Sequence, residues 1–177
     1  TSGGLLNSIG LENIGADALV NQKAPIWAGW KVPVIVNIAG ESVADYARLA
    51  ERLNEVKGIS GLEVNISCPN VTAGGAEFGA RPDSAAEVTA AVRQATTHPL
   101  LVKLTPNTAD ITAVAKAVAE AGADAISLIN TLKGMAIDLG RRRPLLGNIT
   151  GGLSGPAIKP VALYMVYEVA AAVSIPI

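Results

Sequence analysis

Cysteine is almost absent from this chain of 177 residues, because Cys68 is the only one. No intramolecular disulfide can form, and nothing in the cysteine usage points to secretion. Metal ligands are scarce as well, since His98 is the only histidine and the carboxylates lack the spacing of a metal site. The formal net charge of −1 gives no electrostatic reason to expect a nucleic acid or an acidic membrane surface. We therefore expect a cytoplasmic protein with no metal ion, no nucleic-acid partner and no membrane partner.

Long hydrophobic runs are lacking too. No window reaches the roughly 20 apolar residues that a membrane-spanning helix needs, and residues 1–10 do not resemble a signal peptide. Neither a G-x-G-x-x-G motif nor a P-loop motif occurs, so neither type of phosphate site is visible. What the sequence has instead is 50% hydrophobic residues, spread over many short runs. This composition excludes a disordered chain and is typical of buried strands covered by helices.

Short β-branched runs alternate with longer amphipathic segments. The short runs predict strands over 32–40, 61–67, 99–105 and 124–130, with the start of a fifth at 175–177. Helical spacing predicts helices over 42–57, 83–97, 110–121 and 158–173, and a shorter one within 16–30. We expect Ser42 and either Asp83 or Ser84 as N-caps, Gly58 and Gly122 as C-terminal stops, and long loops up to Pro82 and Pro156.

The connections between these strands are too long for hairpins, which indicates parallel strands joined by helices. A doubly wound open sheet and a (β/α)8 barrel both fit this pattern. A complete barrel usually needs about 250 residues and eight strands, whereas four full strands and the start of a fifth are visible here. No linker divides the chain, so we expect a single domain over residues 1–177.

Four of the expected strands end in a polar side chain: Asn37, Asn65, Lys103 and Asn130. Ligand sites of parallel α/β folds lie at the carboxyl ends of the strands, so these groups would form a donor-rich mouth for a planar polar ligand. The alternative is that Asn often ends strands because it tolerates turn geometry. Glu63 has the same strand parity as Asn65, so we expect it to point into the interior, with Lys103 as the partner of its carboxylate.

Cys68 follows the second strand end, in the segment N-I-S-C-P-N. Pro69 restricts the backbone here, so the thiol is held in place, although a free cysteine is often only a small core residue. A Cys–His protease pair is disfavoured, because His98 precedes a strand and so lies at the opposite end of the sheet. A general base that works alongside a hydride transfer is the better interpretation of this thiol.

Two further segments are compatible with either a structural or a functional role. The glycine-rich stretch 150–160 opens a helix, so its amides could face an anion or a cofactor edge, but a plain tight loop fits equally well. Residues 140–144 carry three arginines, which fit either a solvated turn or a contact with a partner.

Five motifs in this order resemble the class 1 dihydroorotate dehydrogenases: L-L-N-S-I-G-L-E-N, E-V-N-I-S-C-P-N, V-K-L-T-P-N, I-N-T-L-K-G-M-A-I-D and N-I-T-G-G-L-S-G-P-A-I-K-P-V-A-L. The last motif is most similar to the class 1B catalytic subunit. Class 2 relatives carry Ser as the catalytic base, so Cys68 favours class 1. The resemblance implies a (β/α)8 barrel that holds FMN at its mouth and oxidises dihydroorotate to orotate in pyrimidine biosynthesis.

The resemblance also implies roles for individual residues. Cys68 would take a proton from C5 of dihydroorotate while hydride passes from C6 to the flavin. Substrate binding would fall to Asn7, Ile9, Gly10, Leu11, Asn65, Asn70, Asn130 and Thr131. Flavin binding would fall to Asn37, Lys103, Gly152 and Ser154. The implied partners are an electron-transfer subunit with FAD and a 2Fe–2S cluster, and further copies of the chain in a homo-oligomer.

The chain also departs from the family pattern. The strands expected to supply a flavin-binding lysine and the flavin phosphate site are missing, so the sequence resembles strands three to six of a barrel with the start of strand seven. We expect the isolated chain to be an incomplete barrel domain with little FMN binding and little activity. A dihydropyrimidine dehydrogenase-type flavin domain is an alternative, although those relatives usually have His where this chain has Asn70. A second alternative is that the chain is a non-catalytic fragment.

Overall fold

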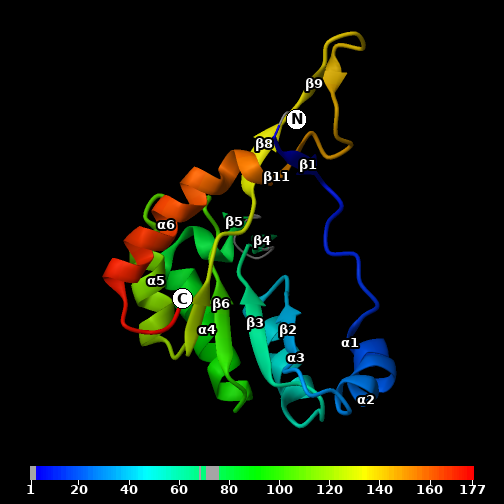
Figure 1. The fold of residues 1–177 in the computed structure, drawn as a ribbon, viewed down its shortest axis with the longest axis vertical. Coiled ribbons are helices and arrows are strands. Elements are labelled where there is room, and N and C mark those ends of the chain that lie inside the picture. Colours follow the sequence, from blue (N-terminus) through cyan, green and yellow to red (C-terminus); the bar gives the residue numbers. More distant parts are fainter. Residues whose placement is uncertain (1–2, 68, 71–75) are drawn as a thin grey trace.

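The computed structural model describes residues 3–67, 69–70 and 76–177. Its centre is a four-stranded parallel sheet in the order β2 (Ile35–Ile38), β3 (Gly61–Asn65), β6 (Leu100–Lys103) and β7 (Ala125–Ser127). Figure 1 shows these strands side by side in chain order. The parallel pairing confirms the expected strand–helix units. Residues 175–177 are not a strand, but the Ile126 amide donates a 2.9 Å hydrogen bond to the Pro176 carbonyl, so this segment runs beside β7.

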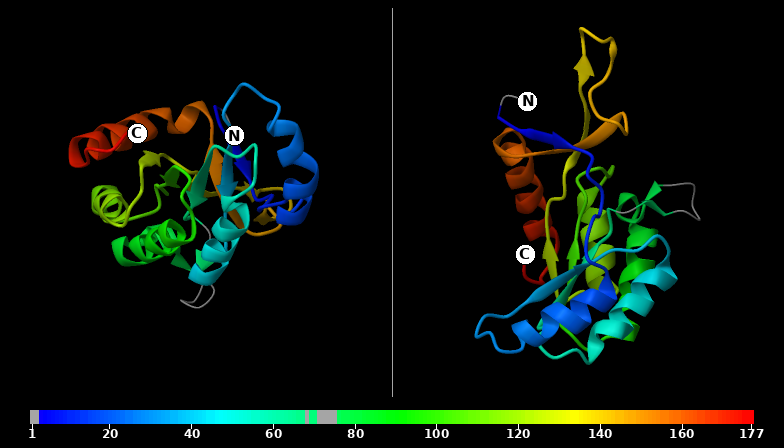
Figure 2. Two further views of the ribbon diagram at one scale, coloured as in Figure 1. Left: turned by 90° about the horizontal axis from the view of Figure 1, so that it is seen from below. Right: turned by 90° about the vertical axis from the view of Figure 1, so that its right-hand side faces the viewer.

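Four helices cover the outer face of the sheet: α3 (Val43–Asn54), α4 (Pro82–Ala95), α5 (Ile111–Glu120) and α6 (Lys159–Ala172). They follow one another around the sheet, as the left-hand view of Figure 2 shows. Three of them lie within segments predicted to be helical, and α4 begins one residue before the predicted segment 83–97. The N-terminal helical segment is also present, as α1 (Ala16–Ala18), the π-helical turn η1 (Leu19–Lys23) and α2 (Ala24–Trp27). None of the described helices is both long and apolar enough to cross a bilayer.

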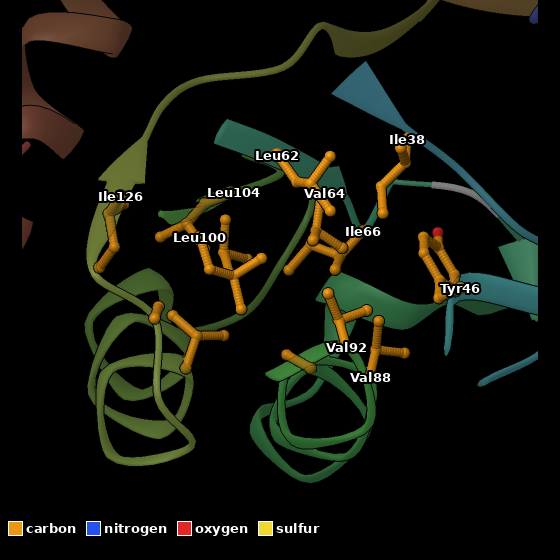
Figure 3. Packing of buried hydrophobic residues seen from close by; sticks show 14 of the residues in the cluster. Ile38, Tyr46, Leu62, Val64, Ile66, Val88, Val92, Leu100, Leu104 and Ile126 are labelled. Atoms are coloured by element: carbon orange, nitrogen blue, oxygen red, sulfur yellow. The ribbon is translucent and has the colours of Figure 1, made fainter. Parts of the chain in front are cut away.

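The core lies between the sheet and the helices, and Figure 3 shows its packing. Alternate strand residues point toward the helices and are buried: Val36, Ile38, Leu62, Val64, Leu100, Val102 and Ile126. The residues between them face the other side of the sheet, since successive side chains of a strand point to opposite faces. That inner face carries the polar side chains Asn37, Glu63, Asn65, Lys103 and Ser127.

The prediction of a long loop up to Pro156 is wrong, because about half of its residues form strands. A three-stranded antiparallel sheet has the order β1 (Leu5–Asn7), β11 (Thr150–Ser154) and β8 (Leu132–Met135). Beyond it β9 (Ile137–Asp138) pairs with β10 (Arg143–Pro144) in a hairpin that projects from the body (Figure 1). Sequence periodicity missed these strands because their glycines and polar residues do not alternate with apolar ones.

Shorter elements fill the remaining connections. The expected loop up to Pro82 contains β4 (Pro69–Asn70), β5 (Ala76–Glu77) and the 3-10 turn η2 (Phe78–Ala80). A second 3-10 turn, η3 (Pro156–Ile158), precedes α6.

The helix ends were predicted well, with one exception. Ser42 caps α3 through a 3.2 Å hydrogen bond from the Asp45 amide, and Gly58 and Gly122 adopt positive φ angles of 94° and 105° after α3 and α5. The cap predicted for α4 is wrong. Arg81 is its N-cap and Pro82 its first residue, because the fixed φ of proline suits the first helical position. Ser84 lies inside the helix and donates to the Phe78 carbonyl at 2.6 Å.

Candidate functional site at the carboxyl end of the parallel sheet

A hydrogen-bonded cluster of side chains joins the ends of β3 and β7. Asn130 donates through Nδ2 to Asn65 Oδ1 at 2.9 Å and to Ser67 Oγ at 2.8 Å. The Ser67 amide also donates to Asn65 Oδ1, at 3.2 Å. Asn65 ends β3 as predicted, whereas Asn130 lies three residues beyond the last residue of β7. The structure thus brings these two predicted residues together, and each fixes the orientation of the other's amide.

Tyr46 on α3 anchors this cluster from behind. Its buried hydroxyl donates a 2.7 Å hydrogen bond to the Asn65 carbonyl, and its ring meets Phe78 edge-on with centroids 5.5 Å apart. The hydroxyl thus gives this buried carbonyl a hydrogen-bond partner. The backbone of Asn65 is therefore held by the core, while its side chain is held by Asn130 and Ser67.

The antiparallel sheet adds three more of the predicted residues. Asn7 on β1 lies opposite Gly152 on β11, and Thr131 precedes β8. A Cβ atom on Gly152 would lie 2.3 Å from Thr131 Oγ1, so the backbone of β11 packs directly against this side chain. The Asn130 side chain accepts from the Thr131 amide at 2.9 Å, which connects this group with the cluster at β3.

The first half of the glycine-rich stretch is therefore a strand and not a plain loop. Residues 150–154 form the central strand of the three-stranded sheet, with ladder partners on both sides. Their backbone groups are committed to β1 and β8, because a central strand pairs along both edges. Ser154 lies opposite Leu5 at the far end of β11, away from Gly152.

Lys103 ends β6 as predicted and lies in register with Asn65 on one side and Ser127 on the other. The expected pairing of Glu63 with Lys103 is wrong. Glu63 instead accepts 2.6 Å hydrogen bonds from Asn37 Nδ2 and from Ser127 Oγ, and within the described part of the chain Lys103 makes no ion pair. Asn37 is the third of four residues in β2, so it does not end that strand.

A pocket lies beside this face. Residues 10–16, β2 and the inner side of α3 line a pocket of about 400 Å³. The predicted residues Gly10 and Leu11 line it together with Asn37, while Ile9 is 74% exposed. Neither Asn65 nor Asn130 lines this pocket, whereas Asn37 lies on both the pocket and the polar face.

Two predicted residues cannot be placed fully. Cys68 lies outside the described residues, and Asn70 is described only as backbone, in β4. His98, the single histidine, precedes β6 and thus lies at the amino end of the sheet, as expected. The Nε2 atom of His98 is buried and has no hydrogen-bond partner among the described residues. No cluster of potential metal ligands occurs in the described ranges, either here or elsewhere.

Sequence reasoning missed three residues of this region as site members: Ser67, Ser127 and Asn107. Asn107 donates to the Thr131 carbonyl at 3.1 Å and accepts from the Lys133 amide at 3.0 Å, so it ties the loop after β6 to β8. Strand parity with Lys103 could have identified Ser127. Asn107 is the last residue of the motif V-K-L-T-P-N, which could have pointed to it, although its partners are 24 and 26 residues away in the chain.

Comparison with known proteins gives a consistent result. A family model described as dihydroorotate dehydrogenase matches residues 1–177. Among curated relatives, the catalytic subunits of dihydroorotate dehydrogenase B (NAD(+)) from Citrifermentans bemidjiense and Pelobacter propionicus are each 58% identical over 177 residues, and that from Geobacter sulfurreducens is 56% identical. Each alignment covers 100% of this chain and 58% of the relative. The chain therefore spans a little over half the length of the curated relatives it matches.

Similarity to solved structures is weaker. The carboxyl transferase domain of Rhizobium etli pyruvate carboxylase aligns with 54% of this chain and 16% of its own, at a TM-score of 0.40 and 22% identity. A similarity of this size supports no conclusion about function.

Proposed function

Because this chain belongs to the dihydroorotate dehydrogenase family, we propose that its protein catalyses the FMN-dependent oxidation of dihydroorotate to orotate, a step of pyrimidine biosynthesis. The observation that carries the proposal is the Asn65–Asn130 cluster beside Lys103, a set of amides and one ammonium at the carboxyl end of a parallel sheet. Such a site suits a planar ligand with several carbonyl groups.

We further propose that residues 1–177 form one incomplete domain of a (β/α)8 barrel, corresponding to about strands three to six with the start of strand seven. The sequential order of β2, β3, β6 and β7 supports this, as does the Pro176 segment beside β7. The inner face of the sheet would then be the barrel interior, which explains why it carries Glu63 and Lys103 rather than apolar residues alone.

The donor set on this face fits a flavin. Lys103 has no ion pair among the described residues, and Asn37 and Asn65 add amide groups on the same side of the sheet. We assign Asn37, Lys103, Gly152 and Ser154 to FMN binding. When bound, FMN supplies the capacity to accept a hydride, and the protein supplies binding and orientation.

The substrate would be held by Asn7, Asn65, Asn70, Asn130 and Thr131, with backbone help from Ile9, Gly10 and Leu11. The amides of Asn65 and Asn130 are pre-oriented by their mutual hydrogen bond, which lowers the cost of ordering them around a ligand. Cys68 would remove the proton from C5 of dihydroorotate. A thiol has an ordinary pKa of about 8.5, so the reaction is expected to be faster at alkaline pH.

The curated relatives are named as catalytic subunits, which supports a separate electron-transfer partner. We propose that this partner carries FAD and a 2Fe–2S cluster, and that the enzyme is a homo-oligomer of the cytoplasm.

The experiment uses the full product of the gene that encodes this chain. Purified protein should show flavin absorbance at about 450 nm, and anaerobic dihydroorotate should bleach it while dihydrouracil should not. Bleaching by dihydrouracil alone would favour the dihydropyrimidine dehydrogenase-type alternative. If the purified protein contained no flavin and bound none on reconstitution, the proposal would be contradicted.

Cys68→Ser tests the assignment of the base. Flavin reduction by dihydroorotate should slow by about 10²–10⁴-fold, because a serine hydroxyl is a far weaker base at the same pH. Stopped-flow absorbance measures the rate, and Ser60→Ala, a change at the amino end of β3, is the control. An unchanged rate in Cys68→Ser would remove Cys68 from the mechanism.

A further inference from the structure

The Glu63 carboxylate lies on the inner face of the sheet and connects three strands. Its two oxygens accept hydrogen bonds of 2.6 Å from Asn37 Nδ2 on β2 and from Ser127 Oγ on β7. In the strand register Glu63 lies opposite Asn37 on one side and Leu101 on the other, and β6 separates it from β7. The bond to Ser127 therefore crosses β6, close to the position of Lys103.

The chemistry of a carboxylate determines how Asn37 is oriented. An ionised carboxylate only accepts hydrogen bonds, so the amide that faces it must present its NH₂ group. The carbonyl oxygen of Asn37 then points away from Glu63 and is available as an acceptor. A hydrogen bond from Ser127 holds the other oxygen, which keeps the carboxylate itself from rotating.

We propose that Glu63 is a positioning residue, which fixes the amide of Asn37 so that its carbonyl oxygen accepts a hydrogen bond from an N–H group of the bound flavin. This inference rests on the proposed function, since it assumes a flavin on the inner face. Glu63 acts only through Asn37. Without the carboxylate, the amide can present either its oxygen or its nitrogen, and half of the possible orientations lose the bond.

Flavin affinity is the readout, measured by fluorescence titration of the deflavinated full gene product with FMN. Glu63→Gln should weaken FMN binding about tenfold, because the side-chain amide of Gln can donate to Asn37 and so permits the reversed orientation. The matched control is Glu51→Gln, a change at an exposed residue of α3, which should leave the affinity unchanged.

A double-mutant cycle separates positioning from a general structural effect. In an Asn37→Ala background, Glu63→Gln should cause no further loss of FMN affinity, since the group it orients is gone. Losses that add in the double variant would overturn the inference.

Glu63→Asp keeps the charge but is shorter by one methylene and cannot reach both Asn37 and Ser127. Glu63→Asp should also weaken FMN binding. If its affinity for FMN equalled that of the unchanged protein, the charge of Glu63 alone would be sufficient and the positioning role would be overturned.

Circular dichroism and thermal melting establish that each variant is folded. If the Glu63 variants do not fold, Ser127→Ala replaces them. It should weaken FMN binding about two- to threefold, an effect that Asn37→Ala should abolish, and no loss in Ser127→Ala would overturn the inference. Failure of the proposed function looks different, because the unchanged protein would then bind no FMN and both proposals would be overturned.

Discussion

At the residue scale, the polar groups of the candidate site are held in place by hydrogen bonds within the protein. The Tyr46 hydroxyl donates to the Asn65 carbonyl, and the Asn65 side-chain oxygen accepts hydrogen bonds from Asn130 and the Ser67 amide. A buried acceptor without a partner is costly, so these bonds connect the stability of the core with the geometry of the mouth.

Tyr46→Phe tests this connection. The change removes one donor and leaves the Asn65 carbonyl without it, so the free energy of unfolding should fall by about 1–3 kcal/mol. Urea denaturation followed by circular dichroism measures it. The control is Tyr164→Phe, because Tyr164 is 62% exposed and its loss of a hydroxyl should change stability little. Equal effects of the two changes would contradict the importance of the buried bond.

At the scale of elements, β11 places its backbone where no side chain fits. A Cβ atom on Gly152 would come within 2.3 Å of Thr131 Oγ1 and 2.7 Å of its Cβ. The central position of β11 between β1 and β8 leaves it little room to move. The close approach, rather than a positive φ, is the reason for a glycine here.

Gly152→Ala should therefore displace Thr131 or β11 and destabilise the protein by about 1–3 kcal/mol. Thermal unfolding measures the change in Tm. Gly147→Ala is the matched control, since a Cβ atom there meets nothing within 4 Å. If Gly152→Ala were as stable as Gly147→Ala, the strand would be able to shift, and the close packing would not constrain the sheet.

The N-cap of α5 makes a prediction about pH. The Asp110 carboxylate accepts hydrogen bonds from the Ala113 and Thr112 amides at 3.0 and 2.9 Å, and these bonds, with that from the Thr112 hydroxyl, lower the pKa of Asp110 from its ordinary value. A lowered pKa in the folded state means that the stabilisation is complete above the unfolded value and is lost as the pH falls through the folded one.

Asp110→Ala should lower Tm by about 2–4 °C at pH 7, and the difference from the unchanged protein should shrink below about pH 4. Asp110→Asn should lower Tm less than Asp110→Ala does at pH 7, because Asn is also a good N-cap. Differential scanning calorimetry from pH 3 to pH 7 measures both. A deficit in Asp110→Ala that stays constant with pH would show that the charge of Asp110 does not contribute.

At the scale of the whole molecule, the described chain leaves large apolar side chains exposed. On α6, Leu163, Tyr164 and Tyr167 are 66%, 62% and 71% exposed, and on the projecting hairpin Leu139 is 85% exposed. Monomeric proteins rarely expose apolar groups in clusters, so these surfaces favour association with other protein surfaces.

We expect the 177-residue chain by itself to self-associate. Replacing Leu163 and Tyr167 together by Lys should lower the average mass measured by sedimentation velocity, because it adds two charges to the exposed face of α6. Glu168→Lys changes the charge on the same helix without removing an apolar group and is the control. A monomer at all concentrations for the unchanged chain would contradict this expectation.

Features that depend on neighbours along the chain were predictable from the amino acids alone. The alternation of strands and helices, the Ser42 cap and the strand ends at Asn65 and Lys103 were predicted correctly, because hydrophobic periodicity and capping act over a few residues. The family resemblance also came from the order of its motifs. Side-chain parity correctly placed Glu63 on the inner face, but it could not select its partners.

The partners of Glu63 depend on how the strands are arranged in the sheet. Glu63 bonds to residues 26 and 64 positions away, and Asn130 to one 65 positions away, so sheet order and register determine which side chains meet. The antiparallel sheet joins Asn7 to Gly152 across most of the chain for the same reason. These contacts depend on how the segments pack in space, and no local pattern of the sequence encodes that geometry.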